Sequence, residues 1–254
     1  MLRQALILAG GLGTRMYPFT KQIPKPLALL DHKPIIYHIL MSLKFHGIEE
    51  VIIHVAYQGQ LIRDYLGDGT SLGLNIKYAP SHIPVGTGGG LRIAAGILDD
   101  DFICMNSDEI TNLNFRDLAN FHVSHKSLAT ISLVEVKDVT DLGVAVVEDE
   151  HIRRFVEKPT PEEAPSHLVS QGIYALNRGI IDEIPNTPSP SLERDVWPKL
   201  ASKGQLLAFR APRTVYWKSL NNPKELENMR IEMWSGRLKW LREYQEDFES
   251  DLLG

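Results

Sequence analysis

The strongest constraint on the fold lies near the N-terminus, where an apolar run ends in a glycine-rich turn. Residues 5–9 read Ala-Leu-Ile-Leu-Ala, and the turn that follows contains Gly10, Gly11 and Gly13. A short apolar run without polar alternation predicts a strand buried on both faces, as in a parallel sheet. Glycines let the backbone approach a ligand closely and direct N–H groups at it, an arrangement that binds phosphate. The turn is therefore a candidate phosphate site, although by itself it is equally compatible with a structural role.

Two basic residues follow this turn and narrow the choice of ligand. Arg15 and Lys25 add positive charge at the same edge, which suits a polyphosphate. No Gly-Lys-Ser/Thr follows at the required spacing, so the P-loop pattern is excluded. The dinucleotide fingerprint is disfavoured too, because Met16 stands where its third glycine would be. A Rossmann-type dehydrogenase is thus a poor match.

Strand and helix patterns alternate along the first half of the chain. Besides the first strand, strands are expected over 51–55, 75–78 and 102–106, and helices over 33–47, 58–66 and 91–98. A second glycine cluster at 86–90 precedes the third helix, and Asp108 follows the fourth strand. Such alternation predicts an open, mainly parallel sheet whose strand ends line a ligand crevice. Both glycine clusters and Asp108 should meet at that edge.

The second half is richer in strands and ends in a helical pattern. Strands are expected over 128–136, 143–148, 151–156, 171–176, 206–210 and 215–217, with helices over 115–125 and 192–203. We expect one domain over residues 1–222 and a helical extension over 223–254. The extension is predicted to place five apolar residues near one face, packed on the domain or at a homodimer contact: Trp234, Leu238, Leu241, Phe248 and Leu252.

Composition limits the class of protein. The chain has 254 residues, 43% of them hydrophobic, and a net charge of -5. These values favour a globular protein with a sizeable core and argue against a general nucleic-acid binder. No apolar run approaches membrane-spanning length, and no signal-peptide pattern is present, so we expect a cytoplasmic protein without a membrane partner.

Two reactive side chains inside predicted strands are expected to be structural. Cys104 is the only cysteine, which leaves no disulfide framework, and it lies in an apolar run. His54 lies in the strand 51–55 and has no partner at metal-ligand spacing. We therefore expect His54 to pack or form a hydrogen bond in the core.

The first turn, continued by Pro24-Lys25-Pro26, resembles the signature of the sugar-phosphate nucleotidyltransferases. Further segments in the same order resemble that family over roughly residues 3–227: Gly86–Leu91, Asn106–Asp108, Leu142–Val144, Phe155–Pro159 and Ser191–Pro198. The resemblance implies a Rossmann-like, three-layer α/β fold. It also implies a mixed, mostly parallel sheet, a small β-rich sugar-binding portion and a C-terminal helix.

The resemblance also implies roles for individual residues. Arg15, Lys25 and Asp108 would be catalytic, and Asp108 would hold Mg²⁺ together with position 219. The nucleotide would bind to Ala9, Gly10, Gly11, Gly13, Thr14, Gly86, Thr87 and Gly88. The sugar phosphate would bind to Gly143, Glu157, Lys158 and Ser170.

Two positions depart from the family pattern. Ser219 stands where the family has a second metal-binding Asp, so the cation would rest mostly on Asp108. Ser170 stands where the family has a sugar-facing Asn. Glu109 could assist Asp108 in holding the cation or be a solvated loop acid, and the second alternative is favoured.

The implied reaction joins a nucleoside monophosphate from a nucleoside triphosphate to a sugar 1-phosphate and releases pyrophosphate. Guanylyl transfer is favoured, because Asn106-Ser107-Asp108 resembles the mannose- and heptose-type guanylyltransferases. Uridylyl transfer stays open, and with either base the sugar partner could be a hexose, heptose or cyclitol phosphate. A catalytically weak sugar-nucleotide sensor is the alternative from another class, because Ser219 lacks a carboxylate.

Overall fold

A single mixed sheet forms the centre of the molecule. The computed structural model describes residues 2–17 and 19–253. Nine strands lie in the order β5-β4-β1-β6-β11-β8-β12-β10-β9. In the N-terminal half, all neighbours pair in parallel: β1 (Gln4–Ala9), β4 (Glu50–Val55), β5 (Asn75–Pro80) and β6 (Asp101–Asn106). This half contains the four strands that the sequence pattern predicts.

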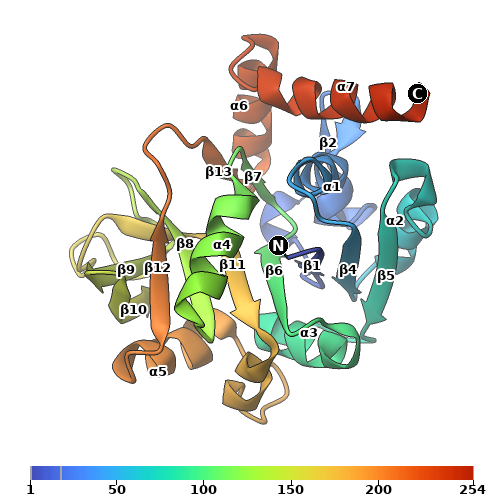
Figure 1. Ribbon diagram of the computed structural model, residues 1–254. Helices are drawn as coiled ribbons and strands as arrows, with labels where there is room; N and C mark the ends of the chain where they lie inside the picture. Colours follow the sequence, from blue (N-terminus) through green and yellow to red (C-terminus); the bar gives the residue numbers. More distant parts are fainter. Residues whose placement is uncertain (1, 18, 254) are drawn as a thin grey trace.

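The other half of the sheet pairs mainly antiparallel. It consists of β8 (Ala129–Glu135), β9 (Gly143–Glu148), β10 (His151–Glu157), β11 (Leu168–Asn177) and β12 (Leu206–Arg210). Only β8 and β12 run parallel there, and β11 joins the two halves by pairing antiparallel with β6. The α/β class is therefore confirmed, but parallel pairing predominates only in the N-terminal half. Figure 1 shows the two halves at opposite sides of the molecule.

Helices cover both faces of the sheet. Alternate residues of β1 point to opposite faces, so Ile7 joins one hydrophobic cluster and Leu6 joins the other. Three of the helices that contribute to the Ile7 cluster are α1 (Ile35–Phe45), α2 (Gly59–Leu66) and α4 (Phe115–His125), and the C-terminal helices described below also join it. Those that contribute to the Leu6 cluster are α3 (Gly86–Ala94) and α5 (Trp197–Ser202). The molecule therefore has three layers.

Two short strand pairs lie outside the main sheet. β2 (Leu29–Leu30) pairs with β3 (Lys33–Pro34), and β7 (Glu109–Thr111) pairs antiparallel with β13 (Trp217–Ser219). Strand β7 directly follows Asp108 and is absent from the sequence-based expectation. The β7–β13 pair brings a segment from the C-terminal part of the chain to the end of β6.

The C-terminal extension is two helices rather than one. The chain turns between α6 (Pro223–Trp234) and α7 (Lys239–Leu253), where Gly236 has a φ of 79°. Such a left-handed backbone angle favours glycine and ends a helix. The residues that join the main core come from α6, the turn and the start of α7: Leu226, Met229, Met233, Leu238, Trp240 and Leu241. Figure 1 shows α7 lying across α1.

The predicted single apolar face is wrong, because the helix breaks at Gly236. Leu238 and Leu241 are buried, whereas Trp234 is 78% exposed, because the turn rotates α7 relative to α6. Phe248 and Leu252 lie outside the side chains that the structure describes. A homodimer contact in this region stays a prediction.

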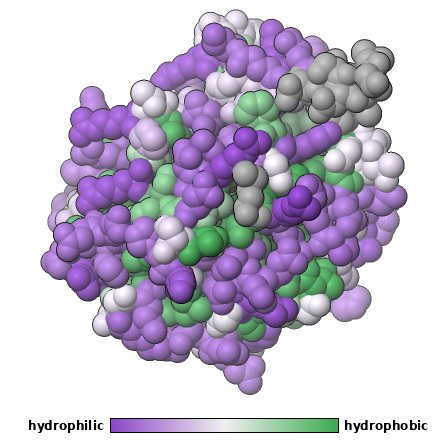
Figure 2. Space-filling view, viewed as in Figure 1, coloured by the Kyte–Doolittle hydropathy of each residue, from purple (hydrophilic) through white to green (hydrophobic). Residues whose placement is uncertain are grey.

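One face of the molecule is mostly polar. Figure 2 shows a hydrophilic face on which apolar residues are visible mainly in hollows between polar ones. Over residues 2–17 and 19–253, no helix combines the length and apolarity needed to cross a bilayer.

Glycines allow α3 to pack tightly beside His54. The helix begins at Gly86, five residues before the predicted start at Leu91. A methyl group at Gly10 would lie 2.3 Å from Cε1 of His54, and one at Gly90 would lie 2.7 Å from Nδ1. His54 is 2% exposed, and its Nε2 lies 3.2 Å from Oγ of Ser81. The expectation of a core histidine is therefore confirmed.

We expect His54 to make the free energy of unfolding depend on pH. Burial lowers the pKa of His54 from 6.5 to about 4, so between these values the unfolded chain binds a proton that the folded chain does not. The contribution of neutral His54 to the free energy of unfolding is therefore complete above pH 6.5. It falls by about 3 kcal/mol as the pH drops toward 4. Urea unfolding at pH 7 and pH 4.5 should show a smaller loss of stability for His54→Gln than for the wild type. An equal loss in both proteins would contradict this.

Candidate active site

The glycine-rich turn after β1 folds back on the segment that carries Lys25. Gly13 has a φ of 62°, and its carbonyl oxygen accepts a hydrogen bond of 2.7 Å from Oγ1 of Thr20. A methyl group at Gly13 would lie 3.2 Å from Cβ of Lys25. Both the backbone angle and this close approach require glycine. The turn therefore places the start of the Lys25 segment against the end of β1.

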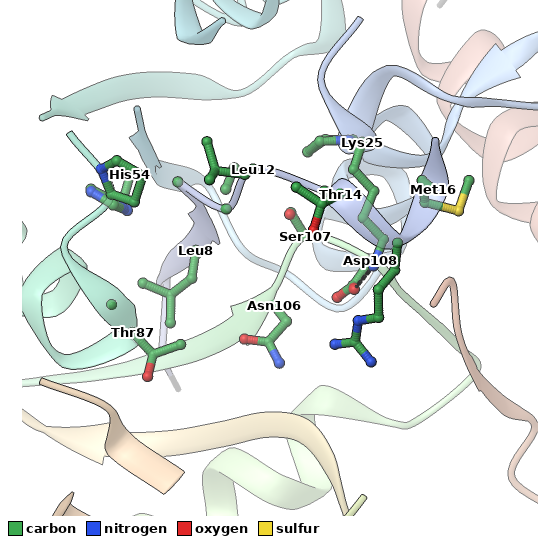
Figure 3. A pocket seen from close by; sticks show the side chains of 18 of the residues that line it. Leu8, Leu12, Thr14, Met16, Lys25, His54, Thr87, Asn106, Ser107 and Asp108 are labelled. Atoms are coloured by element: carbon green, nitrogen blue, oxygen red, sulfur yellow. Dashed lines mark hydrogen bonds and ion pairs between the residues drawn. The ribbon is translucent and has the colours of Figure 1, made fainter. Parts of the chain in front are cut away.

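A cavity of about 490 Å³ opens between this turn, the start of α3 and the end of β6. Figure 3 shows labelled side chains around it. We call it the turn cavity. Its lining includes most of the residues predicted to bind the nucleotide: Ala9, Gly10, Gly11, Gly13, Thr14, Gly86 and Thr87. A methyl group at Gly11 would meet no atom within 4 Å, so the backbone there faces open space.

Gly88 is placed differently from the sequence-based expectation. It is buried, it does not line the turn cavity, and its N–H donates a hydrogen bond of 2.9 Å to the carbonyl oxygen of Pro190. The amide of Gly88 is therefore already used within the protein. Its role in this structure is to join α3 to the segment before Leu192.

Lys25 and Asp108 meet in the turn cavity. The ammonium Nζ of Lys25 forms an ion pair with Oδ2 of Asp108, although the two residues are 83 positions apart. Their side chains are only 15% and 18% exposed. Figure 3 shows Lys25 extending toward Asp108 from the opposite wall of the cavity. The predicted convergence of these two residues is thus present in the fold.

A second cavity of about 330 Å³ adjoins the first. We call it the β11 cavity. Its lining includes all the residues predicted to contact the sugar phosphate: Gly143, Glu157, Lys158 and Ser170. Six residues line both cavities: Arg15, Gly86, Thr87, Asn106, Asp108 and Asn221. The two cavities therefore meet at Asp108 and Arg15.

Opposite charges lie side by side in the β11 cavity. Nζ of Lys158 is 3.5 Å from Oε1 of Glu157. Burial and the neighbouring carboxylate of Glu193 raise the pKa of Glu157, and Lys158 opposes this shift. Arg15, which comes from the first turn, lies 3.8 Å from Asp141, and both side chains are largely exposed. The cavity thus offers cations for an anionic group and a carboxylate for hydroxyl groups.

Known proteins resemble this chain over most of its length. A family described as nucleotidyl transferase matches residues 4–232. The chain belongs to the nucleotidyl transferase family.

Two curated relatives of this nucleotidyl transferase are both named as mannose-1-phosphate guanylyltransferases. It is 36% identical over 244 residues to the probable mannose-1-phosphate guanylyltransferase 1 of Oryza sativa subsp. japonica, which covers 93% of this chain. It is 34% identical over 223 residues to the mannose-1-phosphate guanylyltransferase of Mycobacterium tuberculosis, which covers 87% of this chain. The chain spans 66% and 62% of the length of these relatives.

Solved structures support the fold. HddC from Yersinia pseudotuberculosis, complexed with GMP-PN, superposes with a TM-score of 0.77 at 27% identity, covering 91% of this chain and 100% of that chain. A UDP-glucose pyrophosphorylase complexed with UDP-glucose superposes with a TM-score of 0.79, covering 92% of this chain and 99% of that chain. Its 18% identity shows a shared fold alone.

Glu109 of this nucleotidyl transferase is buried, which corrects its prediction as a solvated loop acid. It is 5% exposed because β7 is covered by β13. Oε1 accepts a hydrogen bond of 3.1 Å from Oγ of Ser219, and Oε2 accepts one of 2.8 Å from Nε1 of Trp217. Burial and the nearby Asp108 raise the pKa of Glu109 well above its usual range, and Lys25 opposes this shift. The sequence pattern favoured the wrong environment for this residue because the β7–β13 pairing is long-range.

Glu193 is a second acid that sequence reasoning left without a role. Its carboxylate accepts hydrogen bonds of 2.7 Å from Oγ1 of Thr87 and Oγ of Ser191, and one of 3.2 Å from the hydroxyl of Tyr174. Glu193 therefore ties the start of α3 to β11 and lines the β11 cavity. The signal was present in the Ser191–Pro198 segment, which resembles the family.

Ser170 is held by its own turn. Its Oγ accepts a hydrogen bond of 3.1 Å from the N–H of Gly172, and the residue is 8% exposed. Ser170 lines the β11 cavity beside Tyr174 and Glu193. Its short side chain leaves more room there than an asparagine would.

The oxygen donors near Asp108 fit a hard divalent cation. Over the described residues 2–17 and 19–253, no group of three or more His, Cys, Asp or Glu side chains could hold a metal ion. Mg²⁺ does not need such a group, because it is held by one or two carboxylates together with waters and substrate phosphates. The carboxylates of Asp108 and Glu109 and the hydroxyl of Ser219 all line the β11 cavity and offer oxygen donors of this kind.

Proposed function

We propose that this chain transfers a nucleoside monophosphate from a nucleoside triphosphate to a sugar 1-phosphate. The observation that carries the proposal is the junction of two cavities at Asp108. One cavity has a glycine-rich turn and Lys25, which suit a triphosphate. The other has Lys158 and Glu157, which suit a phosphorylated sugar. The names of the curated relatives support the same reaction.

The reaction balances as a single displacement. A phosphate oxygen of the sugar 1-phosphate attacks the α-phosphorus of the triphosphate, and a new P–O bond forms. The bond between the α-phosphorus and the bridging oxygen to the β-phosphate breaks, and pyrophosphate leaves. Such a displacement needs the reactants in line and the negative charge neutralised, with little covalent help from the protein.

Each cation of the site has a distinct place in this scheme. Lys25 is largely buried in the turn cavity and is paired with Asp108, so we assign it to the phosphates at the reacting centre. Arg15 lines both cavities and would bind the triphosphate from their shared edge. Lys158 would hold the phosphate of the sugar. When Mg²⁺ is bound, it supplies charge neutralisation on the triphosphate, and Asp108 is the residue that we assign to hold it.

In the free protein Lys25 is paired with Asp108, so binding of a triphosphate would have to break this ion pair. Their ion pair keeps both side chains in the cavity without substrate. Arrival of a triphosphate offers Lys25 a stronger set of anionic partners and frees the carboxylate of Asp108. In the free protein the ion pair therefore keeps both side chains in the cavity. In the reactive arrangement Lys25 would contact the phosphates and Asp108 would hold the cation.

Guanylyl transfer is the favoured specificity. Both curated relatives named above are mannose-1-phosphate guanylyltransferases, and the HddC structure was solved with GMP-PN. Uridylyl transfer remains the competing choice within the same reaction class. The open backbone at Gly11 provides a base-binding edge without a charged side chain.

A panel of substrates tests the function. GTP, UTP, dTTP, CTP and ATP are combined with mannose, glucose and heptose 1-phosphates in the presence of Mg²⁺, and pyrophosphate release is measured. We expect release with GTP at the highest kcat/KM. Release with another triphosphate alone would keep the reaction and change the base. No release with any pair, together with tight binding of a sugar nucleotide, would indicate the sensor alternative.

A further inference from the structure

We propose that Glu109 provides the second carboxylate of the cation site, in place of the side chain at position 219. The proposal rests on the proposed function, since it assigns a residue to the cation of that reaction. Glu109 is a neighbour of Asp108 in the chain and lines the β11 cavity with it. Four features of the fold support the assignment.

The first feature is the strand register. In the β7–β13 pair, Ser219 lies directly opposite Glu109. Directly opposed residues of an antiparallel pair have their side chains on the same face of the sheet. A carboxylate at position 109 of β7 or at position 219 of β13 would therefore reach the same part of the β11 cavity. With serine on β13, the carboxylate comes from β7.

The second feature is the orientation of the carboxylate. Ser219 donates to Oε1 at 3.1 Å and Trp217 donates to Oε2 at 2.8 Å, so both oxygens are held by neutral donors from β13. The same strand is tied to Asp108, whose carbonyl oxygen accepts from the N–H of Leu220 at 2.8 Å. These bonds fix the two acids relative to each other. Metal ligands are typically oriented by such neighbours.

The third feature is the space made by a glycine. Gly172 has a φ of 67°, and a methyl group there would lie 2.8 Å from Oε1 of Glu109 and 2.6 Å from Nδ2 of Asn106. The backbone angle is strained for any other residue, and a Cβ there would force the ends of both side chains to shift. Gly172 thus leaves room for the polar groups of Glu109 and Asn106 at the wall of the cavity.

The fourth feature is charge. Lys25 is paired with Asp108, and no Lys, Arg or His among the described residues forms an ion pair with Glu109. A buried carboxylate without a cation is costly, and a glutamine at lower cost could accept from Nε1 of Trp217 with its amide oxygen and donate to Oγ of Ser219 with its amide nitrogen. A divalent cation between Asp108 and Glu109 would supply the missing positive charge. A purely structural link between β7 and β13 would not need an acid.

Direct measurement of Mn²⁺ binding tests the assignment without using activity. The full chain is titrated with Mn²⁺ alone, and free Mn²⁺ is followed by electron paramagnetic resonance. We expect Glu109→Gln to weaken binding about tenfold or more relative to the wild type, as loss of a group from a metal site does. The matched control is Glu135→Gln, which changes an exposed acid on β8 and should leave the affinity unchanged.

A second variant returns the carboxylate from the other strand. Glu109→Gln combined with Ser219→Asp should restore most of the Mn²⁺ affinity, because the two positions face each other. Thermal unfolding of each variant checks that the protein is folded. Unchanged affinity in Glu109→Gln, or no recovery in the folded double variant, would overturn the assignment. If the wild type still releases pyrophosphate in that case, the proposed function stands and only the role of Glu109 fails.

Discussion

Replacement of Lys25 by Met is expected to lower kcat/KM for pyrophosphate release about 10³-fold, or about 4 kcal/mol of transition-state stabilisation. Lys25 is largely buried in the turn cavity against Asp108, the residue at which the two cavities meet, so its charge is screened little by solvent. Negative charge on the phosphates at the reacting centre therefore loses its nearest side-chain cation. Methionine keeps the length and apolar packing of the stem, so the loss is attributable to the ammonium.

The measurement compares kcat/KM with the favoured triphosphate and sugar phosphate. Lys21→Met is the matched control, because Lys21 belongs to the same segment but is exposed and lines neither cavity. It should retain wild-type activity. If Lys25→Met kept most of the activity in a folded protein, our placement of this side chain at the reacting centre would be wrong.

The second large effect is expected for Asp108→Asn, which should lower the rate at saturating substrates about 10²- to 10³-fold. The substitution keeps the shape of the side chain but removes the charge that we assign to the cation. It also leaves the ammonium of Lys25 without its partner in the free protein. Saturating Mg²⁺ should therefore fail to restore the wild-type rate.

Titration of the rate with Mg²⁺ separates this role from simple loss of the ion pair. Asp108→Asn should need a higher Mg²⁺ concentration for half of its own maximal rate. The control Asp138→Asn changes an exposed acid whose hydrogen bonds are local, to the backbone and side chain of Thr140. An unchanged Mg²⁺ requirement in Asp108→Asn would show that Asp108 does not hold the cation.

Local patterns determined much of the N-terminal half. The apolar run at β1 and the positive φ at Gly13 follow from short-range chemistry, because strand burial and backbone freedom are properties of a few adjacent residues. Parallel strands then bring their carboxyl ends to one edge. That rule, together with the resemblance that assigns Lys25 to the reacting centre, predicted that Lys25 and Asp108 would meet, although 83 positions separate them.

Tertiary structure alone decided the details on which the cation site depends. The register of β7 against β13 sets Ser219 opposite Glu109, and no local pattern contains that information. Burial of Glu109 follows from the same pairing, so its sequence context of a polar loop was misleading. The N–H of Gly88 likewise donates to the carbonyl oxygen of Pro190, a residue far away in the chain, and no local pattern predicts this bond.

The sequence by itself determined which chemical groups this protein has and at which strand ends they lie. The tertiary structure decided which of those groups share a cavity, which are buried and which donors are already used. The physical reason is that side-chain environment is set by long-range packing and strand register, whereas strand formation and turn geometry are set by neighbours in the chain.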